Sequence, residues 1–503
     1  MSFLLLAAVF FAYLVSLAVY RLHFSPIAKF PGPKLAALSR WYEFYYEVIL
    51  RGQFTFHIAE LHKKYGPIVR INPEELHVSD SEFWDTLYGP GRVDKYDYFT
   101  NRLNIPRSIF STADYNLHKL RKAPLLPLFS KKRISDFQPV IREKLDILCS
   151  KIDKYVAGGH PFAINRALTA FSGDVITTYV FGQSYQHLES PDFKETFQEP
   201  FMAASEVGHV ALQFKWLYPL MQFLPEWLVL KMQPQILLVL QLAKDFDVKL
   251  KAILSGTAKE NPEHPTILYE LLRSDLPPQE KQIDRLNEEA QLLIAAGLTT
   301  SSWAMSVITF HIIQSRSYYD QLRADLIGAL PHKSDASTFN WSDVERLPYL
   351  NACAREGLRL SYGVTARSPR LWDKPLQYQG WTIPPRTPVS LTIVDHNHQE
   401  EIFPDSHAFK PERWLTQDAQ GLWQLDQHMD RWFFPFGKGS RSCLGVNLAM
   451  AEIHLGLATL FRKYDFELFE TDVSDVKLAH DFFLPSARLD SKGVRVTVKE
   501  AEK

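Results

Sequence analysis

The chain has 503 residues, 46 % of them hydrophobic, with 34 Phe and 11 Trp, so it can bury a large core and enclose apolar cavities. Its formal net charge of −1 leaves no excess of basic side chains to neutralise phosphates, which argues against nucleic acid as a partner. The three cysteines, Cys149, Cys353 and Cys443, are an odd and widely spaced set. They give no disulfide framework and fit a reducing compartment.

An uncharged apolar run occupies the N-terminus from Phe3 to Tyr20. At about 1.5 Å per helical residue, it is long enough to cross the roughly 30 Å hydrocarbon core of a bilayer, so we expect a transmembrane helix. A cleaved signal peptide is the alternative, but no lysine or arginine precedes the run and Arg21 follows it directly. Arg21, Lys29 and Lys34 lie on its C-terminal side, and by the positive-inside rule the rest of the chain should face the cytosol.

The chain is expected to have three parts. We predict a membrane anchor at residues 1–22, a proline-rich hinge at 23–40 and one large globular domain at 41–503. Within the hinge, the sequence Phe30-Pro-Gly-Pro-Lys34 should stiffen and redirect the backbone between the anchor and the globular domain.

Helical spacing of apolar residues dominates the globular domain, and short strands are few. Gly66-Pro67 ends the first helix, and Asn72-Pro73 lies between the first two strands. From 134 to 255 apolar and charged residues alternate at helical spacing, which indicates a bundle of helices. In chain order we expect a helix at Gln53–Tyr65, a β-hairpin from Ile68–Ile71 and Leu76–Val78, a loop at Thr100–Asp114, a helix starting at Tyr115, and a closing β-hairpin at Leu489–Val498.

The stretch from Met202 to Leu230 is rich in Phe, Trp, Leu and Met and contains few charges. Such a stretch can be core, substrate channel or a surface that dips into the membrane. We expect core, with membrane contact as the next interpretation.

Asp284–Ser315 contains no proline and one glycine, which predicts a single helix about 48 Å long that crosses the whole domain. Midway along it, Ala296 and Thr300 lie one turn apart on one face. Gly297 removes a side chain where a flat ligand must come near, and the Thr300 hydroxyl can bond to a carbonyl one turn earlier and open the helix locally. This arrangement favours a groove for dioxygen and water; a packing notch between helices is the alternative.

Glu356 and Arg359 lie three residues apart in Leu347–Leu360 and so share one helical face. A solvent-exposed pair of this kind contributes less than about 1 kcal/mol. If the pair is buried, deleting one member leaves an unpaired charge at a cost of roughly 3–5 kcal/mol. We therefore expect a structural role.

Cys443 lies in the glycine-rich segment Phe436–Gly445. Gly437 and Gly439 permit positive φ angles in a tight loop, and Gly445 lets the backbone pass close to a flat object. The residues that follow are typical of a helix, whose N-terminal N–H groups and dipole would stabilise a thiolate. A shielded thiolate suits iron ligation and is a known proximal haem ligand, whereas a buried free cysteine at a helix start is the alternative.

Phe436, Gly439, Arg441, Cys443 and Gly445 fill every fixed position of the haem-binding loop of the cytochrome P-450 family, and the sequence is identified as a member of that family. The resemblance covers essentially everything after the anchor. It implies the P-450 fold, mainly α with small β-sheets (α+β), preceded by one transmembrane helix, and it makes 41–503 the catalytic domain. Three more motifs follow the family's order: Ala296–Ser301, Glu356–Arg359 and Phe409–Trp414.

The resemblance assigns roles to residues at matching positions. Cys443 would bind the haem iron, Thr300 and Thr299 would be the catalytic residues on the oxygen side, and Glu356, Arg359 and Arg413 would form a buried structural triad. Haem contacts are expected from Phe436, Gly437, Arg441, Gly445, Arg370, His118, Lys122, Ala296 and Gly297. Substrate contacts are expected from Ile105, Ile109, Phe110, Val364, Thr365, Ala366, Phe482 and Phe483.

Two positions depart from the family pattern. Thr299 stands where most members have a carboxylate, so proton delivery should run through Thr300, water and Ser301. His118 and Lys122 stand where most members place Trp and Arg to grip a haem propionate. The alternative for this pair is a solvated basic face shared with Lys119 and Arg121.

The resemblance implies a haem-thiolate monooxygenase of the endoplasmic reticulum that inserts one oxygen atom from O2 into a small apolar molecule. No flavin or nicotinamide fingerprint occurs in the sequence, so electrons should come from a separate NADPH–cytochrome P-450 reductase, which would dock on a basic face formed by Arg431, Lys438 and Arg441. The motifs are most similar to fungal members of the trichodiene-oxygenase type, which implies a terpenoid or polyketide substrate. The alternatives are a haem-thiolate isomerase or dehydratase that needs no O2, suggested by Thr299, and a non-catalytic haem-binding membrane protein.

Overall fold

The computed structural model describes residues 2–501 except 195, 226, 229–230, 232–235, 258–265 and 333–337. Helices dominate and the strands are short, which confirms the expected mainly α fold with small sheets. The α-helices are α1 (Ser2–Val19), α2 (Lys34–Leu38), α3 (Trp41–Phe44), α4 (Phe54–Tyr65), α5 (Trp84–Tyr88), α6 (Asp97–Thr100), α7 (Tyr115–Lys122), α8 (Lys131–Gly158), α9 (Ile164–Phe181), α10 (Gln198–Gln213), α11 (Leu217–Phe223), α13 (Ile236–Leu254), α14 (Ile267–Arg273), α15 (Ile283–Gln314), α16 (Arg316–Ala329), α17 (Trp341–Val344), α18 (Pro348–Ser361), α19 (Ile393–Asn397) and α20 (Val446–Lys463).

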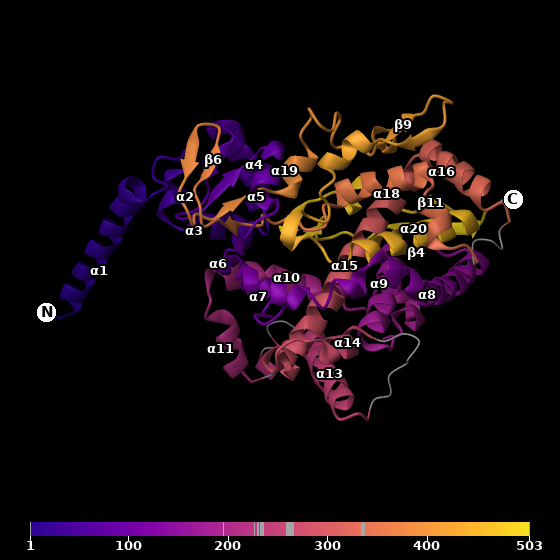
Figure 1. Ribbon diagram of the computed structural model, residues 1–503, viewed down its shortest axis with the longest axis horizontal. Helices are drawn as coiled ribbons and strands as arrows, with labels where there is room; N and C mark the ends of the chain where they lie inside the picture. Colours follow the sequence, from indigo (N-terminus) through magenta and orange to yellow (C-terminus); the bar gives the residue numbers. More distant parts are fainter. Residues whose placement is uncertain are drawn as a thin grey trace.

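The N-terminal apolar run forms α1 and continues as a short π-helix, Tyr20–Phe24. The helical stretch Phe3–Phe24 is long and apolar enough to cross a membrane, and Figure 1 shows α1 projecting away from the body of the protein. Arg70 ties the hinge to this body, since its backbone N–H donates to Pro31 O at 2.7 Å. A Cβ at Gly32 would lie 2.3 Å from Arg70 O, so only glycine fits at this crossing.

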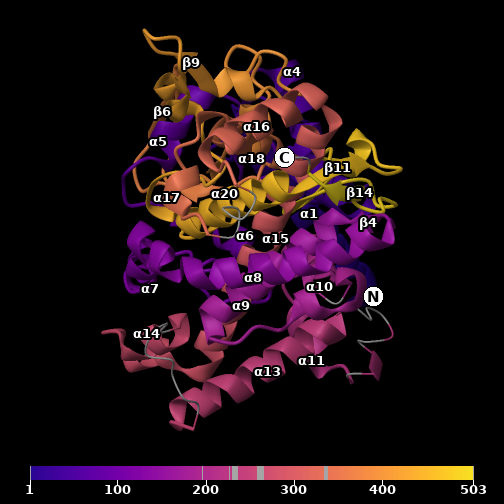
Figure 2. The same cartoon turned by 90° about the vertical axis from the view of Figure 1, so that its right-hand side faces the viewer.

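The central helix α15 meets the same length and composition test, but its apolar window is mostly buried, as expected of a core helix. It packs against α9, α18, α20 and α13 (Figures 1 and 2). Glycines allow two of these crossings. A Cβ at Gly297 would lie 2.6 Å from Ile176 Cγ1 of α9, and a Cβ at Gly357 would lie 2.0 Å from Ile308 Cγ1. In both views α13 and α14 form the edge of the body opposite the strands β6 and β9.

The largest sheet has five short strands in the order β1-β2-β8-β5-β3, and its first two strands form the expected hairpin. A three-stranded sheet, β11-β14-β4, and three two-stranded sheets complete the β-structure. The strands are β1 (Ile68–Arg70), β2 (Leu76–Val78), β3 (Asp94–Lys95), β4 (Phe162–Ala163), β5 (Arg370–Leu371), β6 (Leu376–Tyr378), β7 (Trp381–Ile383), β8 (Val389–Ser390), β9 (Leu415–Gln417), β10 (Trp423–Leu425), β11 (Tyr464–Leu468), β12 (His480–Phe482), β13 (Leu484–Ser486) and β14 (Arg495–Glu500).

The closing hairpin expected at Leu489–Val498 is wrong. Only the second half becomes a strand, β14, and it pairs with the distant strands β11 and β4. The reason is burial: Val494, Val496 and Val498 alternate toward the main core, whereas Leu489 is exposed and has no apolar surface to cover.

The prediction of core for Met202–Leu230 holds only in part. Within this stretch, Ala211 and Leu212 of α10 are buried, and residues 226 and 229–230 lie outside the described residues. The following residues turn outward: Trp216 is 58 % exposed and Phe223 of α11 is 86 % exposed. An apolar surface of this kind is typical of a membrane or partner contact.

Candidate active site

The loop around Cys443 is held by backbone bonds. The Cys443 N–H donates to Phe436 O at 2.9 Å, and α20 begins three residues later at Val446, as predicted. Gly439 has φ +70°, and a Cβ there would lie 1.9 Å from Tyr88 O, so this position requires glycine. Cys443 is exposed, unlike the buried Cys149 and Cys353.

Cys443 is exposed, but protein atoms surround its thiol closely enough to change its pKa. The surrounding protein atoms raise the pKa of the thiol, while the Gly445 N–H and the Lys122 ammonium act in the opposite direction. Lys122 reaches the loop itself, because its Nζ donates to Ser440 O at 2.8 Å and to Ser442 O at 3.2 Å. A cation and a backbone donor therefore stand ready to stabilise a thiolate.

Five basic side chains gather beside this loop: Lys95, His118, Lys122, Arg370 and Arg441. Within the described residues none of them pairs with a carboxylate; four of them donate mainly to carbonyl oxygens instead. Lys95 Nζ donates to Phe110 O at 2.5 Å, Arg370 Nη1 to Ser368 O at 3.1 Å and to its Oγ at 2.8 Å, and Arg441 Nη1 and Nη2 to Thr112 O and Ala113 O at 2.7 Å.

The cations of this cluster disfavour the protonated forms of their neighbours. Burial, with Arg441, Lys95, Lys122 and Arg370 adding to it, lowers the pKa of His118 to about 2. Burial and Arg370 lower the pKa of Arg441 to about 10, and the pKa of Lys95 falls well below its usual value for similar reasons. Arg441 Nε has no hydrogen-bond partner in the described part of the chain. Such a cluster calls for anions, and the two propionates of a haem bound through Cys443 fit it.

The alternative of a solvated basic face for α7 is wrong. His118 and Arg121 are buried, and Arg121 Nε pairs with Glu280 Oε2 at 2.6 Å; Lys119 is exposed. Lys95, by contrast, was missed by the sequence reasoning, because a single lysine in a two-residue strand belongs to no motif.

The midpoint of α15 presents one open face. Ala296 is exposed and Thr300 is half-buried, while Leu298 between them is buried. The hydroxyls of Thr299 and Thr300 donate to Ala295 O and Ala296 O, both at 2.7 Å. The predicted back-bonding is confirmed, but the predicted local opening is wrong, since α15 runs unbroken from Ile283 to Gln314.

Gly297 has a different purpose from the expected one. Its missing side chain faces Ile176 of α9 and not a flat ligand, so the packing notch is the correct interpretation for this residue. The open face of the helix belongs to Ala296 and Thr300, one turn apart.

A small cavity adjoins the open face and is lined by Thr299 and Thr300. Two of its side chains carry polar atoms without a hydrogen-bond partner in the described structure, Gln198 Oε1 and Trp303 Nε1. Gln198 lies outside every motif and Trp303 follows the Ala296–Ser301 motif by two residues, so neither was selected from the sequence. The remaining lining residues are Met202, Gly363, Leu484 and Pro485.

The predicted substrate contacts separate into two groups. Phe110 and Phe483 meet edge to face, with ring centroids 5.3 Å apart, and Ala366 shares a buried cluster with Phe483. The other residues lie elsewhere or are engaged in structural contacts. Thr365 donates to Asp481 Oδ1 at 2.7 Å, Phe482 stacks on His480 at 5.5 Å, Ile109 is in the main core, Ile105 is buried, and Val364 is half-buried.

Glu356 is the centre of a buried network, as predicted. Arg359 donates to both of its carboxylate oxygens, from Nε at 2.9 Å and from Nη2 at 2.8 Å. Arg413 Nε and Trp414 Nε1 add bonds of 3.0 and 2.8 Å. Burial alone would raise the pKa of Glu356, but Arg359 and Arg413 bring it below its usual value. The network joins α18 to the segment before β9.

A second buried carboxyl, Glu452 of α20, escaped the sequence reasoning. Ser172 Oγ donates to its Oε2 at 2.7 Å, and Ser301 of α15 also lies beside it. Burial raises the pKa of Glu452 to about 8, so a protonatable carboxyl lies next to the residue that follows Thr300.

Two of the three cations of the expected basic docking face are paired with carboxylates, and the third turns inward. Arg431 Nη2 pairs with Glu82 Oε1 at 3.0 Å, and Lys438 pairs with Asp85. Arg441 turns inward to the carbonyls of Thr112 and Ala113.

Comparison with known proteins places this geometry in a family. The family described as cytochrome P450 matches residues 32–491. A cytochrome P450 monooxygenase, sdnE of Sordaria araneosa, is 45 % identical over 98 % of this chain and 97 % of its own length. The tryptophan 6-hydroxylase fscE of Fusarium equiseti is 40 % identical over 96 % of this chain and 94 % of its own. The N-acetyltryptophan 6-hydroxylase ivoC of Emericella nidulans is 40 % identical, with 97 % and 95 % covered. The chain therefore belongs to the cytochrome P450 family and is a P450 monooxygenase.

Proposed function

We propose that this P450 monooxygenase inserts one oxygen atom from O2 into a small secondary metabolite, using electrons from a separate NADPH–cytochrome P450 reductase. The observation that carries the proposal is the exposed Cys443 beside five basic groups that form no ion pair with a carboxylate among the described residues. A haem supplies dioxygen activation when it is bound, and the residues of the chain hold and shield it.

Cys443 would be the thiolate ligand, with the Gly445 N–H and Lys122 stabilising its charge. Arg370, Arg441, His118, Lys122 and Lys95 would hold the propionates. Phe436, Gly437, Gly445 and Ala296 would contact the ring, and Glu356, Arg359 and Arg413 would stabilise the domain into which it inserts.

Thr300 would hold a proton donor at the oxygen side, because its hydroxyl lies on the open face of α15. Thr299 lines the same cavity, and its hydroxyl bonds to Ala295 O, so it replaces a carboxylate without supplying an acidic proton. A water held by Thr300 could accept protons from the solvent side.

The proposed substrate class rests on the apolar side chains around Phe483 and on the names of the relatives. Phe110, Ala366 and Phe483 offer apolar surface, which suits a terpenoid or polyketide. Two relatives carry names that specify tryptophan or N-acetyltryptophan hydroxylation, so an aromatic amino-acid derivative is the second class to test.

The chain would be a single-pass protein of the endoplasmic reticulum with its catalytic domain, 41–503, in the cytosol. Residues 1–22 would be the anchor and 23–40 the hinge. Support comes from the apolar stretch Phe3–Phe24 and from the exposed Trp216 and Phe223, which could enter the same bilayer.

Turnover with isotope-labelled dioxygen tests the proposal. The full chain is co-expressed with a fungal reductase, and membranes receive terpenoid, polyketide and aromatic amino-acid substrates with NADPH under ¹⁸O2. We expect one labelled oxygen atom per product and no product without NADPH or O2. Product that forms without O2 would contradict the proposal and favour an isomerase or dehydratase.

A further inference from the structure

Arg102 is a buried cation with no hydrogen-bond or ion-pair partner for its guanidinium among the described residues. It lies in the segment between α6 and α7 and is 0 % exposed. Its Nε, Nη1 and Nη2 atoms all lack a hydrogen-bond acceptor, and it forms no ion pair with any residue that the structure describes. A buried guanidinium in this state is unfavourable unless a ligand completes it.

Contacts with neighbouring residues hold Arg102 in place. Tyr218 Oη donates to Arg102 O at 2.7 Å. A Cβ at Gly208 of α10 would lie 2.8 Å from Arg102 Cγ, so the side chain is seated against a helix that has a glycine at the contact. The guanidinium carbon lies 4.5 Å from the Phe99 ring centroid and 5.1 Å from that of Phe483.

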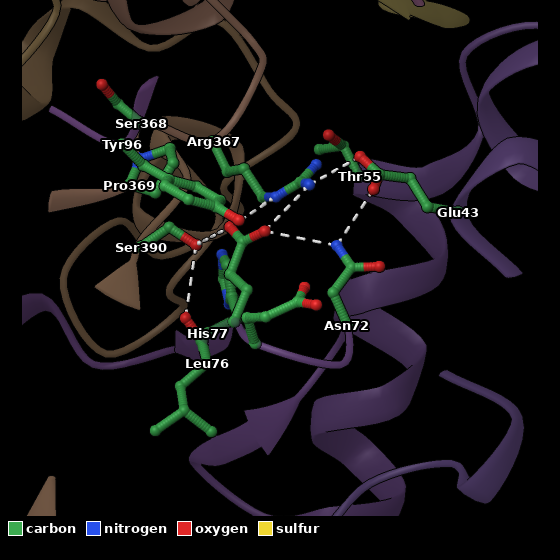
Figure 3. Close-up of polar contacts among 12 residues, drawn as sticks. Glu43, Thr55, Asn72, Leu76, His77, Tyr96, Arg367, Ser368, Pro369 and Ser390 are labelled. Carbon is green, nitrogen blue, oxygen red and sulfur yellow. Dashed lines mark hydrogen bonds and ion pairs between the residues drawn. The ribbon is translucent and has the colours of Figure 1, made fainter. Parts of the chain in front are cut away.

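Another buried arginine, Arg367, contacts the same Phe99 ring as Arg102 but is paired with carboxylates. Arg367 also lies against Phe99, at 5.2 Å, yet its Nε and Nη2 donate to Glu75 and Glu43 at 2.7 and 2.6 Å (Figure 3). Asn72 and Ser390 complete the same carboxylates. Glu43 and Glu75 are thus paired with Arg367, and neither accepts a hydrogen bond from Arg102.

The other buried carboxyls nearby, Asp481 and Glu47, contact residues other than Arg102. Asp481 Oδ1 accepts from Thr365 Oγ1 at 2.7 Å and from the Phe483 N–H at 2.8 Å, and its Oδ2 accepts from Thr55. Glu47 lies 3.9 Å from Arg367 Nη1 and 3.4 Å from His209 Nδ1, and burial together with the Asp481 charge raises its pKa well above its usual value. Neither gives Arg102 a bonded counterion.

The ring that Arg102 touches belongs to the substrate side of the molecule. Phe483 meets Phe110 and shares a cluster with Ala366, and the next residue, Leu484, lines the cavity that includes Thr300. We propose that the substrate carries a carboxylate and that Arg102 binds it, so the enzyme oxidises organic acids in preference to their neutral analogues. This inference rests on the proposed function and specifies its substrate.

Optical titration of the purified, haem-loaded full chain tests the inference without turnover. The probes are matched pairs of a free acid and its methyl ester: dodecanoic acid, indole-3-acetic acid and abietic acid. We expect at least one acid to perturb the haem spectrum with a Kd about tenfold or more below that of its ester, since a charge-assisted bidentate bond is lost in the ester.

Three variants separate binding from folding. Arg102→Gln should abolish the preference for the acid while it keeps ester binding, and Arg102→Lys should restore part of the preference. Arg107→Gln is the matched control, because Arg107 is in the same loop but exposed and paired with Asp284 at 2.8 Å. Haem content and the reduced carbon monoxide spectrum show whether each variant is folded.

An enzyme that prefers no acid over its ester, or an Arg102→Gln protein that keeps the preference, would overturn the inference. Acid binding through Arg102 without O2-dependent turnover would leave it standing while contradicting the proposed function. O2-dependent turnover of neutral substrates alone would support the proposed function and contradict the inference about Arg102.

Discussion

Lys122 and Ser440 are joined by a hydrogen bond of 2.8 Å from the ammonium of one to the carbonyl oxygen of the other. The bond links the end of α7 to the Cys443 loop, far along the chain. Because Lys122 also acts on the Cys443 thiol, one cation serves both the loop and the sulfur. A lysine at this position can replace an arginine, since here it meets carbonyl oxygens as a point charge and does not need the forked geometry.

Replacing Lys122 by methionine should loosen haem. We expect haem to transfer to excess apomyoglobin about tenfold faster than from the unmodified protein, because a charge-assisted bond and a propionate cation are lost together. Lys119→Met is the control, since Lys119 is on the same helix and exposed. Equal rates of transfer from the two variants would show that Lys122 does not hold the cofactor.

The Glu356 network should carry stability and not catalysis. Glu356→Gln leaves Arg359 without its anion, and we expect the free energy of unfolding in urea to fall by roughly 3–5 kcal/mol. The control Arg316→Gln breaks an exposed pair with Asp320 and should cost less than about 1 kcal/mol. A Glu356→Gln protein as stable as this control would contradict the structural role.

Glu452 should make stability depend on pH. Its pKa is about 8 in the folded protein, so between its usual value near 4.5 and 8 the folded chain holds a proton that the unfolded chain has released. The contribution of Glu452 to stability therefore falls as pH rises through this window, by at most about 1.4 kcal/mol per pH unit.

Glu452→Gln should remove this dependence, because glutamine resembles the protonated acid at every pH. The difference in Tm between the variant and the unmodified protein should shift in favour of the variant between pH 5 and pH 8. Glu60→Gln, an exposed control, should show no such trend. A Tm difference that stays constant with pH would contradict the raised pKa of Glu452.

Thr300→Val should uncouple NADPH use from product formation. The variant keeps the shape of the side chain but loses the hydroxyl on the open face, and we expect about tenfold less product per NADPH. Ser306→Ala is the control, because the buried Ser306 hydroxyl, almost two turns beyond Thr300, donates to Ser302 O, its one partner among the described residues. This variant should leave the ratio of product to NADPH unchanged. Full coupling in Thr300→Val would mean that protons reach dioxygen without this hydroxyl.

Local patterns predicted local structure well. The helices α4 and α15 lie within one residue of their predicted ranges, and α7 begins at the predicted Tyr115. Gly66 ends α4 and Asp114 caps α7, whereas α15 could be predicted because its sequence contains no proline. The partner of β14 could not be predicted, since its pairing with β11 depends on which apolar faces meet after the helices have packed.

The residues of the site also fall into two groups, those that the sequence predicted and those that it did not. Cys443, Glu356 and Arg359 stand in motifs whose spacing specifies their neighbours. Lys95, Arg102 and Glu452 are single residues whose importance arises from burial without a matching charge, which no spacing in the sequence records. Gly297 shows the opposite case: the motif was recognised, but only the position of Ile176 reveals what the glycine accommodates.

Ligation by Cys443 is the central claim, and the reduced carbon monoxide spectrum of haem-loaded protein tests it most directly. Cys149→Ser and Cys353→Ser should keep the spectrum of a thiolate-ligated haem, because both cysteines are buried in the apolar core. Cys443→Ser should lose that spectrum, whether or not haem is retained. A Cys443→Ser protein that still gave the thiolate spectrum would contradict the account.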